Sequence, residues 1–160
     1  MTALDARVEI APAASPGELA AVRALIEEYQ RSLGVDLEFQ GFSHELAHLG
    51  EMYGPPDGAL FLAVLAGVPI GCVGVRRFDA RCCEMKRLYV RPQGRGHGVG
   101  RRLAERAMDA GRAAGYAAMR LDTLPTMGDA QALYERLGFR DVAAYRANPV
   151  AGTRFLEAAL

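Results

Sequence analysis

A glycine-rich segment between two regular elements constrains this chain more than any other feature. Residues 91–100 read RPQGRGHGVG, with glycine at positions 94, 96, 98 and 100. Each glycine in a helix or strand costs about 0.5–1 kcal/mol relative to alanine, so this segment belongs to neither. The letters MKRLYV before it predict a strand, and RRLAERAMDAGRAAGY after it predicts a helix. The segment is therefore a loop that opens a helix.

A glycine loop at a helix N-terminus presents backbone N–H groups to an anion, and the helix dipole adds to the attraction. A ligand that carries phosphate is the first hypothesis, with Arg95 as an additional charged contact. The P-loop pattern is absent, because the only lysine, Lys86, precedes the glycines. The dinucleotide pattern GxGxxG fails in every register. What fits is Arg-x-x-Gly-x-Gly, formed by Arg95, Gly98 and Gly100.

The order of predicted elements indicates an α/β fold in one domain that covers residues 1–160. We expect a strand at 7–12, helices at 15–33 and 43–54, two strands within 58–75 and a strand at 82–90. After the loop come a helix at 100–115, a strand at 117–124, a helix at 127–139, and strands at 141–147 and 153–160. This order predicts a mixed, mostly antiparallel sheet with a central parallel crossover through the glycine loop.

Composition excludes several classes of protein. Nineteen basic residues balance nineteen acidic ones, which argues against nucleic acid as a partner. Residues 58–75 carry no charge, but Gly67 and Pro69 interrupt them, so two strands are favoured over a membrane span. Three cysteines without a CxxC pair and an N-terminus without an apolar segment predict a reduced, cytoplasmic protein.

Two motifs resemble those of a known family. The stretch EMKRLYVRPQGRGHGVGRRL resembles the central motif of the GNAT superfamily of N-acetyltransferases, in which Q/R-x-x-G-x-G/A binds the pyrophosphate of acetyl-CoA. The stretch ALYERLGF resembles the family's later motif, a helix that carries a tyrosine and ends in Gly-Phe. The two motifs lie at family-like spacing, and the predicted element order matches the family fold, with helices on both faces of the sheet, over nearly the whole chain.

The resemblance implies acetyl-CoA as co-substrate and names the residues that would hold it. The main chain of the strand that contains Leu88, Tyr89 and Val90 would pair with the pantetheine arm. One departure concerns Met127, because many family members carry asparagine at this position and contact the cofactor through it. The remaining implied contacts, made mainly by backbone amides to the pyrophosphate, belong to Arg95, Gly96, His97, Gly98, Val99, Gly100 and Arg101.

Acetyl transfer to an amine requires a base for the ammonium and an acid for the departing thiolate. Glu84 is the candidate base, because it lies four residues before Leu88 on the same predicted strand face and occupies the place of the base in histone-modifying relatives. Its structural alternative is an ion pair with Lys86 or Arg87. Tyr134 is the candidate acid, from the later motif, and its alternative is a packed helix-face tyrosine. Backbone N–H groups of residues 88–90 would form the oxyanion site.

Two other functions compete with acetyl transfer. Residues 44–48 read HELAH and match the zinc-protease pattern HExxH, with His44 and His48 as ligands and Glu45 as base. No third ligand follows at a family spacing, so we expect no metal site and assign this helix an acceptor-site or surface role. A non-catalytic acetyl-CoA sensor is the second alternative, and it is disfavoured because Glu84 and Tyr134 are both present.

The acceptor remains open at this stage. The first two helices offer a partly aromatic lining, which suits a small amine, an amino-acid-like compound or a peptide N-terminus. We expect no membrane partner, and the C-terminal hairpin offers a pairing surface for a homodimer. The lining residues expected from these helices are Tyr29, Phe39, Phe42, His44, His48 and Tyr53.

Overall fold

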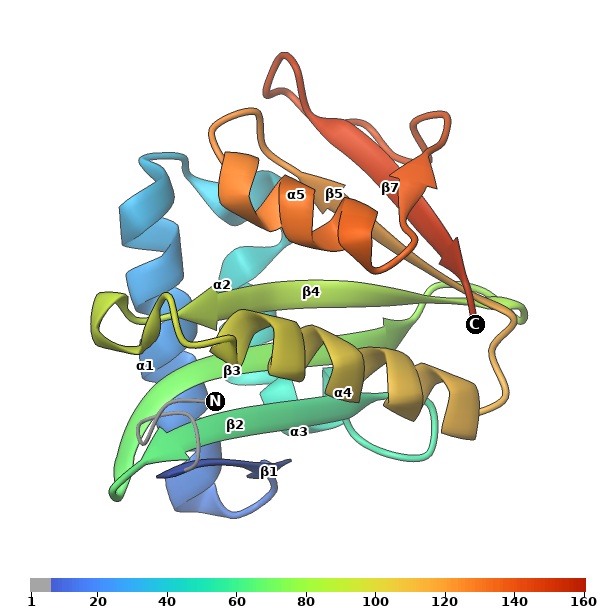
Figure 1. Ribbon diagram of the computed structural model, residues 1–160. Coiled ribbons are helices and arrows are strands. Elements are labelled where there is room, and N and C mark those ends of the chain that lie inside the picture. Colours follow the sequence, from blue (N-terminus) through green and yellow to red (C-terminus); the bar gives the residue numbers. More distant parts are fainter. Residues whose placement is uncertain (1–6) are drawn as a thin grey trace.

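A seven-stranded mixed sheet organises the protein, in a computed structural model that describes residues 7–160 (Figure 1). The strand order is β1-β2-β3-β4-β5-β7-β6, and every neighbouring pair is antiparallel except β4 and β5, which are parallel. The predicted α/β class, mixed sheet and central crossover are therefore confirmed. The strands are β1 (Val8–Pro12), β2 (Ala59–Leu65), β3 (Val68–Arg77), β4 (Cys82–Val90), β5 (Ala118–Thr123), β6 (Arg140–Asp141) and β7 (Arg154–Ala159).

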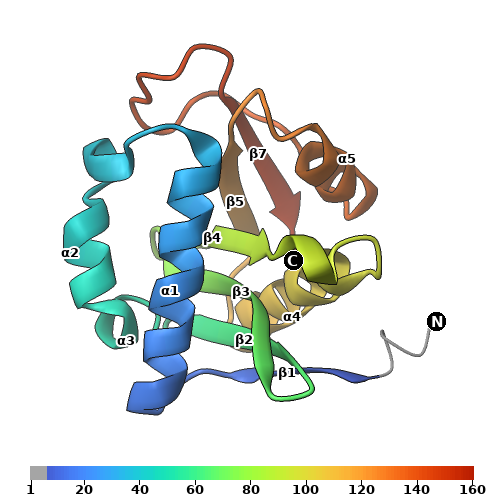
Figure 2. The same ribbon diagram turned by 90° about the vertical axis from the view of Figure 1, so that its left-hand side faces the viewer.

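Helices cover both faces of this sheet (Figure 2). On one face lie α1 (Pro16–Leu33), the short 3-10 helix η2 (Leu37–Gln40), α2 (Phe42–Ala47) and α3 (Leu49–Met52). On the other lie α4 (Val99–Ala113) and α5 (Gly128–Arg136), preceded by the 3-10 turn η3 (Pro92–Gly94). Each face has its own apolar core, built on Leu25 and Ile26 of α1 and on Leu103 and Ala107 of α4.

Local sequence signals explain where α1 begins and ends. The Ser15 hydroxyl accepts a hydrogen bond from the Glu18 N–H, and the Glu18 carboxylate accepts one from the Ser15 N–H, which forms the predicted capping box. Pro16 occupies the first turn, and Gly34 ends the helix in a left-handed conformation with φ of 65°. The capping signals predicted this helix correctly at both ends.

Two predicted elements differ from the structure. The expected helix at 43–54 is divided into α2 and α3 at His48, and α2 begins after Gly41 rather than at a Ser43 cap. The expected strand at 141–147 is reduced to the two residues of β6, and residues 142–153 form an irregular connection instead. Tyr145 and Arg146 of this connection contact Glu84 of β4.

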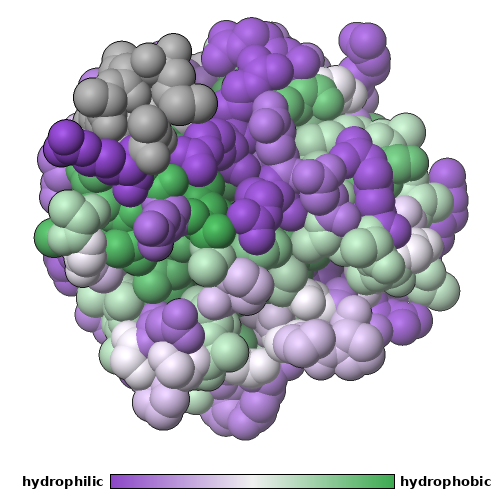
Figure 3. Space-filling view, turned by 60° about the horizontal axis from the view of Figure 1, so that its bottom comes forward, coloured by the Kyte–Doolittle hydropathy of each residue, from purple (hydrophilic) through white to green (hydrophobic). Residues whose placement is uncertain are grey.

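Few large apolar side chains of residues 7–160 are exposed. Figure 3 shows one face, on which hydrophobic residues gather in one area and hydrophilic residues occupy much of the remainder. Among residues 7–160, Phe39 and Val68 are the large hydrophobic residues with substantial exposure. None of the helices in this part of the chain is both long and apolar enough to cross a membrane.

The sheet opens in its centre, where β4 and β5 separate. Their parallel pairing extends only from Cys82 opposite Ala118 to Glu84 opposite Arg120. Beyond this point the two strands diverge, as Figure 1 shows. The edge of β4 from Met85 to Val90 is therefore not covered by β5, although β3 pairs with its other edge.

A bulge in β4 lies at the start of this opening. Lys86 pairs with Gly74 of β3, whereas Tyr89 pairs with Cys72, so β4 has one residue more than β3 over this interval. Arg87 adopts a left-handed conformation with φ of 60°, which is unusual for a non-glycine residue. The extra residue shifts every later side chain of β4 to the opposite face of the sheet.

Candidate active site

A groove of about 660 Å³ runs from the opening between β4 and β5 to the glycine loop. We call it the large groove. Its floor is the end of β4, and the N-terminal ends of α4 and α5 border it. Its lining comprises Tyr29, Ser32, Leu33, Leu88, Tyr89, Val90, Gly94, Arg95, Gly96, Gly98, Val99, Gly100, Thr126, Met127, Gly128, Asp129, Ala130 and Leu133.

The glycine loop leaves open space and backbone donors at the groove. Gly98 caps α4 with φ of 75°, and a methyl group placed on its Cα would meet no atom within 4 Å. No side chain caps α4 at this end. The Arg102 N–H donates to the Gly98 carbonyl, so the N–H groups of Val99, Gly100 and Arg101 precede the helix's own hydrogen-bond ladder. This arrangement suits a phosphate or pyrophosphate.

Most of the predicted cofactor residues lie in this groove. Leu88, Tyr89, Val90, Arg95, Gly96, Gly98, Val99 and Gly100 all belong to its lining. The Arg95 guanidinium donates to the Val90 carbonyl at 2.9 Å and lies over the Tyr89 ring. His97 and Arg101 are outside the lining, and the Arg101 side chain instead pairs with Glu105 on the surface of α4.

A second, narrower space adjoins the large groove. This inner pocket has a volume of about 40 Å³ and shares Tyr29, Leu33, Leu88 and Met127 with the groove, so the two are continuous. Its walls come from α1, η2, the bulge of β4, β5, and the connection before β7. The remaining lining residues are Leu37, Gln40, Met85, Lys86, Arg87, Leu121, Asp122, Leu124, Tyr134 and Asn148.

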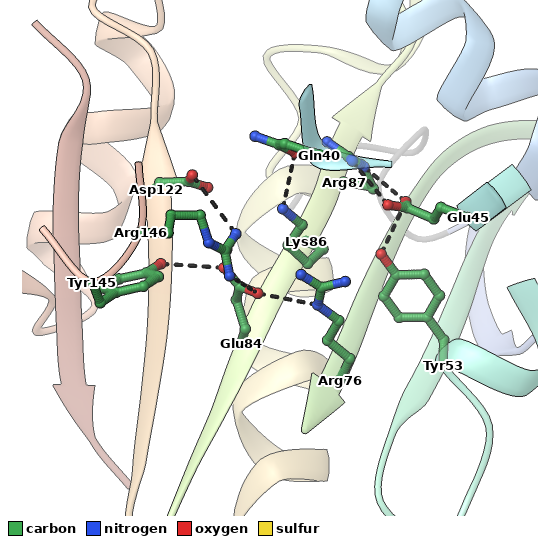
Figure 4. A network of polar contacts seen from close by, with 10 residues as sticks. All are labelled: Gln40, Glu45, Tyr53, Arg76, Glu84, Lys86, Arg87, Asp122, Tyr145 and Arg146. Atoms are coloured by element: carbon green, nitrogen blue, oxygen red, sulfur yellow. Dashed lines mark hydrogen bonds and ion pairs between the residues drawn. The ribbon is translucent and has the colours of Figure 1, made fainter. Parts of the chain in front are cut away.

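Glu84 lies in a buried network of polar contacts beside this pocket (Figure 4). Arg146 contacts both of its carboxylate oxygens at 2.8 Å, and Arg76 donates to Oε1 at 3.1 Å. The Tyr145 hydroxyl donates to Oε2 at 3.2 Å. Burial raises the pKa of Glu84, but nearby Lys86 and the two arginines lower it by more. The pKa therefore lies below its ordinary value, and the carboxylate stays ionised at neutral pH.

The predicted placement of Glu84 needs two corrections. It does not share a face with Leu88, because the bulge at Arg87 intervenes: Leu88 packs toward α4, whereas Glu84 faces the polar network. Its ion-pair partners are Arg76 and Arg146, whereas Lys86 or Arg87 was expected. Glu84 is also not among the residues that line the groove or the inner pocket.

Tyr134 lies where α5 meets the inner pocket. It is buried, packs edge-on against Phe139, and lines the pocket. Burial raises the pKa of its hydroxyl well above the ordinary value, so the group keeps its proton at neutral pH. The hydroxyl donates to no other described side chain, which leaves its proton available to a ligand.

The HELAH segment has a structural role, in which the Glu45 carboxylate is engaged by other side chains. The Glu45 carboxylate is buried and bound by Arg87 at 2.8 and 2.9 Å and by the Tyr53 hydroxyl at 2.9 Å. His44 and His48 do share a side, with ring centroids 4.1 Å apart, but His48 Nδ1 contacts the His44 carbonyl. Within residues 7–160, no three His, Cys, Asp or Glu residues are grouped as metal ligands.

The expected aromatic lining is only partly present. Tyr29 lines both spaces, and its hydroxyl contacts the Met127 sulfur at 3.7 Å. Phe42 and Tyr53 are instead buried in the core under α1. Phe39, His44 and His48 are likewise absent from the lining.

Five polar residues of the inner pocket were not predicted as site residues: Gln40, Lys86, Arg87, Asp122 and Asn148. Lys86 carried a signal, because it is the only lysine of the chain and lies in a strand between Met85 and Leu88, close to Glu84 and Arg87. Asp122 had a weaker signal of the same kind in β5. Asn148 had none, because it lies in the irregular connection that was predicted as strand and turn.

Comparison with known proteins identifies acetyltransferases as the relatives of this chain. The sequence profile of the acetyltransferase (GNAT) family matches residues 21–139. An uncharacterized N-acetyltransferase of Schizosaccharomyces pombe is 38% identical over 152 residues, which cover 94% of this chain and 93% of that protein. An IAA acetyltransferase of Azospirillum brasilense is 40% identical over 123 residues, which cover 76% and 78%.

A solved structure shares the fold. The GNAT family acetyltransferase of Elizabethkingia anophelis with acetyl-CoA bound superposes with a TM-score of 0.65 at 18% identity. The superposition covers 96% of this chain and 99% of that one.

Proposed function

Since the chain belongs to the acetyltransferase (GNAT) family, and is thus an acyltransferase, we propose that it transfers the acetyl group of acetyl-CoA to a primary amine. One observation carries the proposal. The large groove joins the glycine loop to an uncovered strand edge, and it adjoins an inner pocket whose lining includes Lys86, Asp122 and Asn148. A long ligand with an anionic end and an amide-rich arm fits such a path.

The residues of the groove fit acetyl-CoA. The space beside Gly96 and Gly98, where an added methyl group would meet nothing within 4 Å, would accept the pyrophosphate. Arg95, His97 and Arg101 are proposed as further contacts at this end. The edge of β4 from Met85 to Val90 would accept the pantetheine amides as an added strand does. When bound, acetyl-CoA supplies an activated acetyl group as a thioester.

The chain's own groups would move the protons. Glu84 remains the candidate for the general base: it is ionised, as a base must be, but its oxygens are held by Arg76, Arg146 and Tyr145. It would therefore act through water. Asp122 is a second candidate, because it lines the inner pocket and its Oδ2 is buried without a hydrogen-bond partner among residues 7–160. Arg146 lies 3.9 Å from that oxygen.

Tyr134 is the proposed acid for the leaving thiolate. Its hydroxyl keeps its proton at neutral pH and lies in the inner pocket next to the groove. Backbone N–H groups around the bulge of β4 would polarise the carbonyl of the acetyl group. The acceptor classes compatible with this site are a small amine, an amino-acid-like compound and a peptide N-terminus.

A binding experiment and a turnover experiment test the function. Acetyl-CoA at a hundredfold its dissociation constant should stabilise the protein by about 2.7 kcal/mol, and ATP and NAD should not. Release of free thiol in the presence of a panel of primary amines should then identify a reactive acceptor. An unchanged melting temperature at millimolar acetyl-CoA would contradict the proposal. Binding without thiol release from any amine would favour the acetyl-CoA sensor instead.

A further inference from the structure

Lys86 is a buried cation that faces the inner pocket without an ion pair. Its side chain comes from β4 just before the bulge and is almost fully buried. The ammonium donates to the neutral Gln40 side chain at 3.1 Å, and no carboxylate of residues 7–160 forms an ion pair with it. Figure 4 shows the Lys86 side chain extending toward Gln40, with Arg146 between it and Asp122 of β5. A buried charge in this state is costly unless a ligand compensates it.

The surrounding charges leave an excess of one positive charge. Arg87 is matched by Glu45, which binds it through two hydrogen bonds. The remaining charged groups near the pocket are three cations, Lys86, Arg76 and Arg146, and two carboxylates, Glu84 and Asp122. Arg76 and Arg146 bind Glu84, and Arg146 also contacts Asp122. Both carboxylates contact arginines, so Lys86 is the cation left without a partner of opposite charge in direct contact.

Asn148 adds an unused donor to the same pocket. Its Oδ1 accepts a hydrogen bond from the Val150 N–H at 2.9 Å, which fixes the orientation of the amide. Its Nδ2 is buried and has no hydrogen-bond partner among residues 7–160. A buried donor without a partner costs free energy, and an oxygen atom of a ligand would satisfy it.

The size of the inner pocket limits what these donors can bind. A volume of about 40 Å³ admits a group of a few atoms, and the rest of a ligand must extend into the large groove. A planar anion with two oxygens would satisfy both the Lys86 ammonium and the Asn148 amide. Such a group would then place the remainder of the acceptor beside Leu88, where the two spaces join.

We propose that the acceptor amine also carries a carboxylate, and that Lys86 and Asn148 bind this carboxylate in the inner pocket. The acceptor is then an amino acid or a similar amino-carboxylic acid, rather than a simple amine or an amine whose carboxyl group is blocked as an amide. The inference rests on the proposed acetyl transfer and names the acceptor class for it.

The single lysine allows a direct test that needs no turnover. Protein labelled with ¹³C at the lysine Cε gives one lysine side-chain signal, which belongs to Lys86. With CoA bound, the L-α-amino acids are added one at a time, each beside its carboxamide. We expect at least one acid to shift the signal and to raise the pKa of Lys86 from about 8, while its carboxamide does neither. A signal that no acid moves overturns the proposal.

A kinetic test uses the same matched pairs. For reactive acceptors, the ratio of kcat/KM for the acid to that for its carboxamide should be about 10- to 100-fold, the range of a hydrogen bond to a charged group. Lys86→Met should bring this ratio close to one, and Asn148→Asp should lower it by charge repulsion. Arg112→Met removes an exposed positive charge of α4, far from the polar network of Glu84, and should preserve the ratio.

The two proposals fail in different ways. If acetyl-CoA does not bind, the proposed function fails, whereas the lysine signal, then recorded without CoA, still reports whether the pocket accepts a carboxylate. If carboxamides and simple amines react as well as the acids, acetyl transfer stands and the carboxylate site is wrong. A ratio that survives Lys86→Met likewise contradicts the assignment of Lys86.

Discussion

Glu45 and Arg87 form a bidentate ion pair, with contacts of 2.8 and 2.9 Å, that joins α2 to the bulge of β4. Both side chains are almost completely shielded from solvent. The pair therefore holds the unusual backbone of Arg87 in position from the side of the helices. Tyr53 supports it through a third hydrogen bond to Glu45.

Removal of one partner of this pair should strongly destabilise the fold. Glu45→Gln leaves the Arg87 guanidinium buried and uncompensated, a defect that typically costs about 3–5 kcal/mol. Urea unfolding at pH 7 measures the loss. Glu105→Gln is the matched control, because its pair with Arg101 is exposed and worth about 1 kcal/mol or less. Equal effects of the two substitutions would contradict a structural role for the buried pair.

The same pair should contribute to acid unfolding. Burial raises the pKa of Glu45, but Arg87 lowers it by more, so the folded value lies below the ordinary one. The stabilisation is thus complete above about pH 4.3, the unfolded value, and is lost as pH falls through the lower folded value. The difference in stability between wild type and Glu45→Gln should narrow below pH 4.

Substitution of Gly98 and of Gly115 by valine distinguishes the effect of backbone strain on stability from the effect on acetyl-CoA binding. Both have positive φ, of 75° and 91°, and an added side-chain carbon would meet no atom within 4 Å at either position. Valine at either site should cost about 1–2 kcal/mol of stability through the left-handed backbone. Only Gly98→Val should weaken acetyl-CoA binding, by about tenfold or more, in calorimetric titrations. Equal affinity in the two variants would remove the glycine loop from the cofactor site.

Lys86→Met should stabilise the protein at neutral pH. Burial lowers the pKa of Lys86 to about 8, against about 10.4 in the unfolded chain, and one pKa unit corresponds to about 1.4 kcal/mol. The cost is complete below pH 8 and disappears as pH rises to about 10.4, because only the unfolded chain keeps the proton over that interval. The melting temperature of Lys86→Met should exceed that of wild type at pH 7, and the gap should close by pH 10.5.

Glu84→Gln and Asp122→Asn distinguish the two candidate bases. Loss of the base should lower kcat by about 10²–10⁴ and remove the acidic limb of the pH–rate profile. We expect this result for Glu84→Gln, together with reduced stability, since it breaks two buried ion pairs. Rates must therefore be normalised to the folded fraction. Full turnover per folded Glu84→Gln molecule would make Glu84 structural and assign the base to Asp122.

Tyr134→Phe should slow departure of the thiolate. The expected loss in kcat is about 10²–10⁴, and it should shrink when the acyl donor has a better leaving group. Tyr116→Phe is the control, because the Tyr116 hydroxyl donates to the Asp57 carbonyl at 2.7 Å, and neither residue lines the groove or the inner pocket. It should cost about 0.5–1.5 kcal/mol of stability and leave turnover intact. A loss that does not depend on the leaving group would contradict the role of Tyr134 as acid.

Features that depend only on neighbouring residues in the chain, such as the glycine loop and the helix cap, could be predicted from the sequence. A glycine loop between a strand and a helix restricts its own conformation, and Ser15 and Glu18 form a cap within four residues. For the same reason most of the element order was predictable. Contacts of this kind do not depend on where the rest of the chain lies.

The bulge of β4 could not be predicted in this way. Its position depends on the register between β3 and β4, which neither strand determines alone. The arginine and tyrosine that bind Glu84 come from the connection before β7, more than sixty residues later in the chain. Alternation along the strand therefore placed Glu84 on the wrong face relative to Leu88.

Because β4 separates from β5 after Glu84, the edge of β4 from Met85 to Val90 has no neighbouring strand within residues 7–160 to pair with. A strand edge in the middle of a sheet, with only solvent to bind its amides, should exchange its amide hydrogens as rapidly as a peripheral edge does. If a pantetheine arm occupies that edge, it completes the sheet as well as delivering an acetyl group. The folded state would then become more populated as acetyl-CoA rises, which ties the lifetime of this protein to the supply of its own substrate.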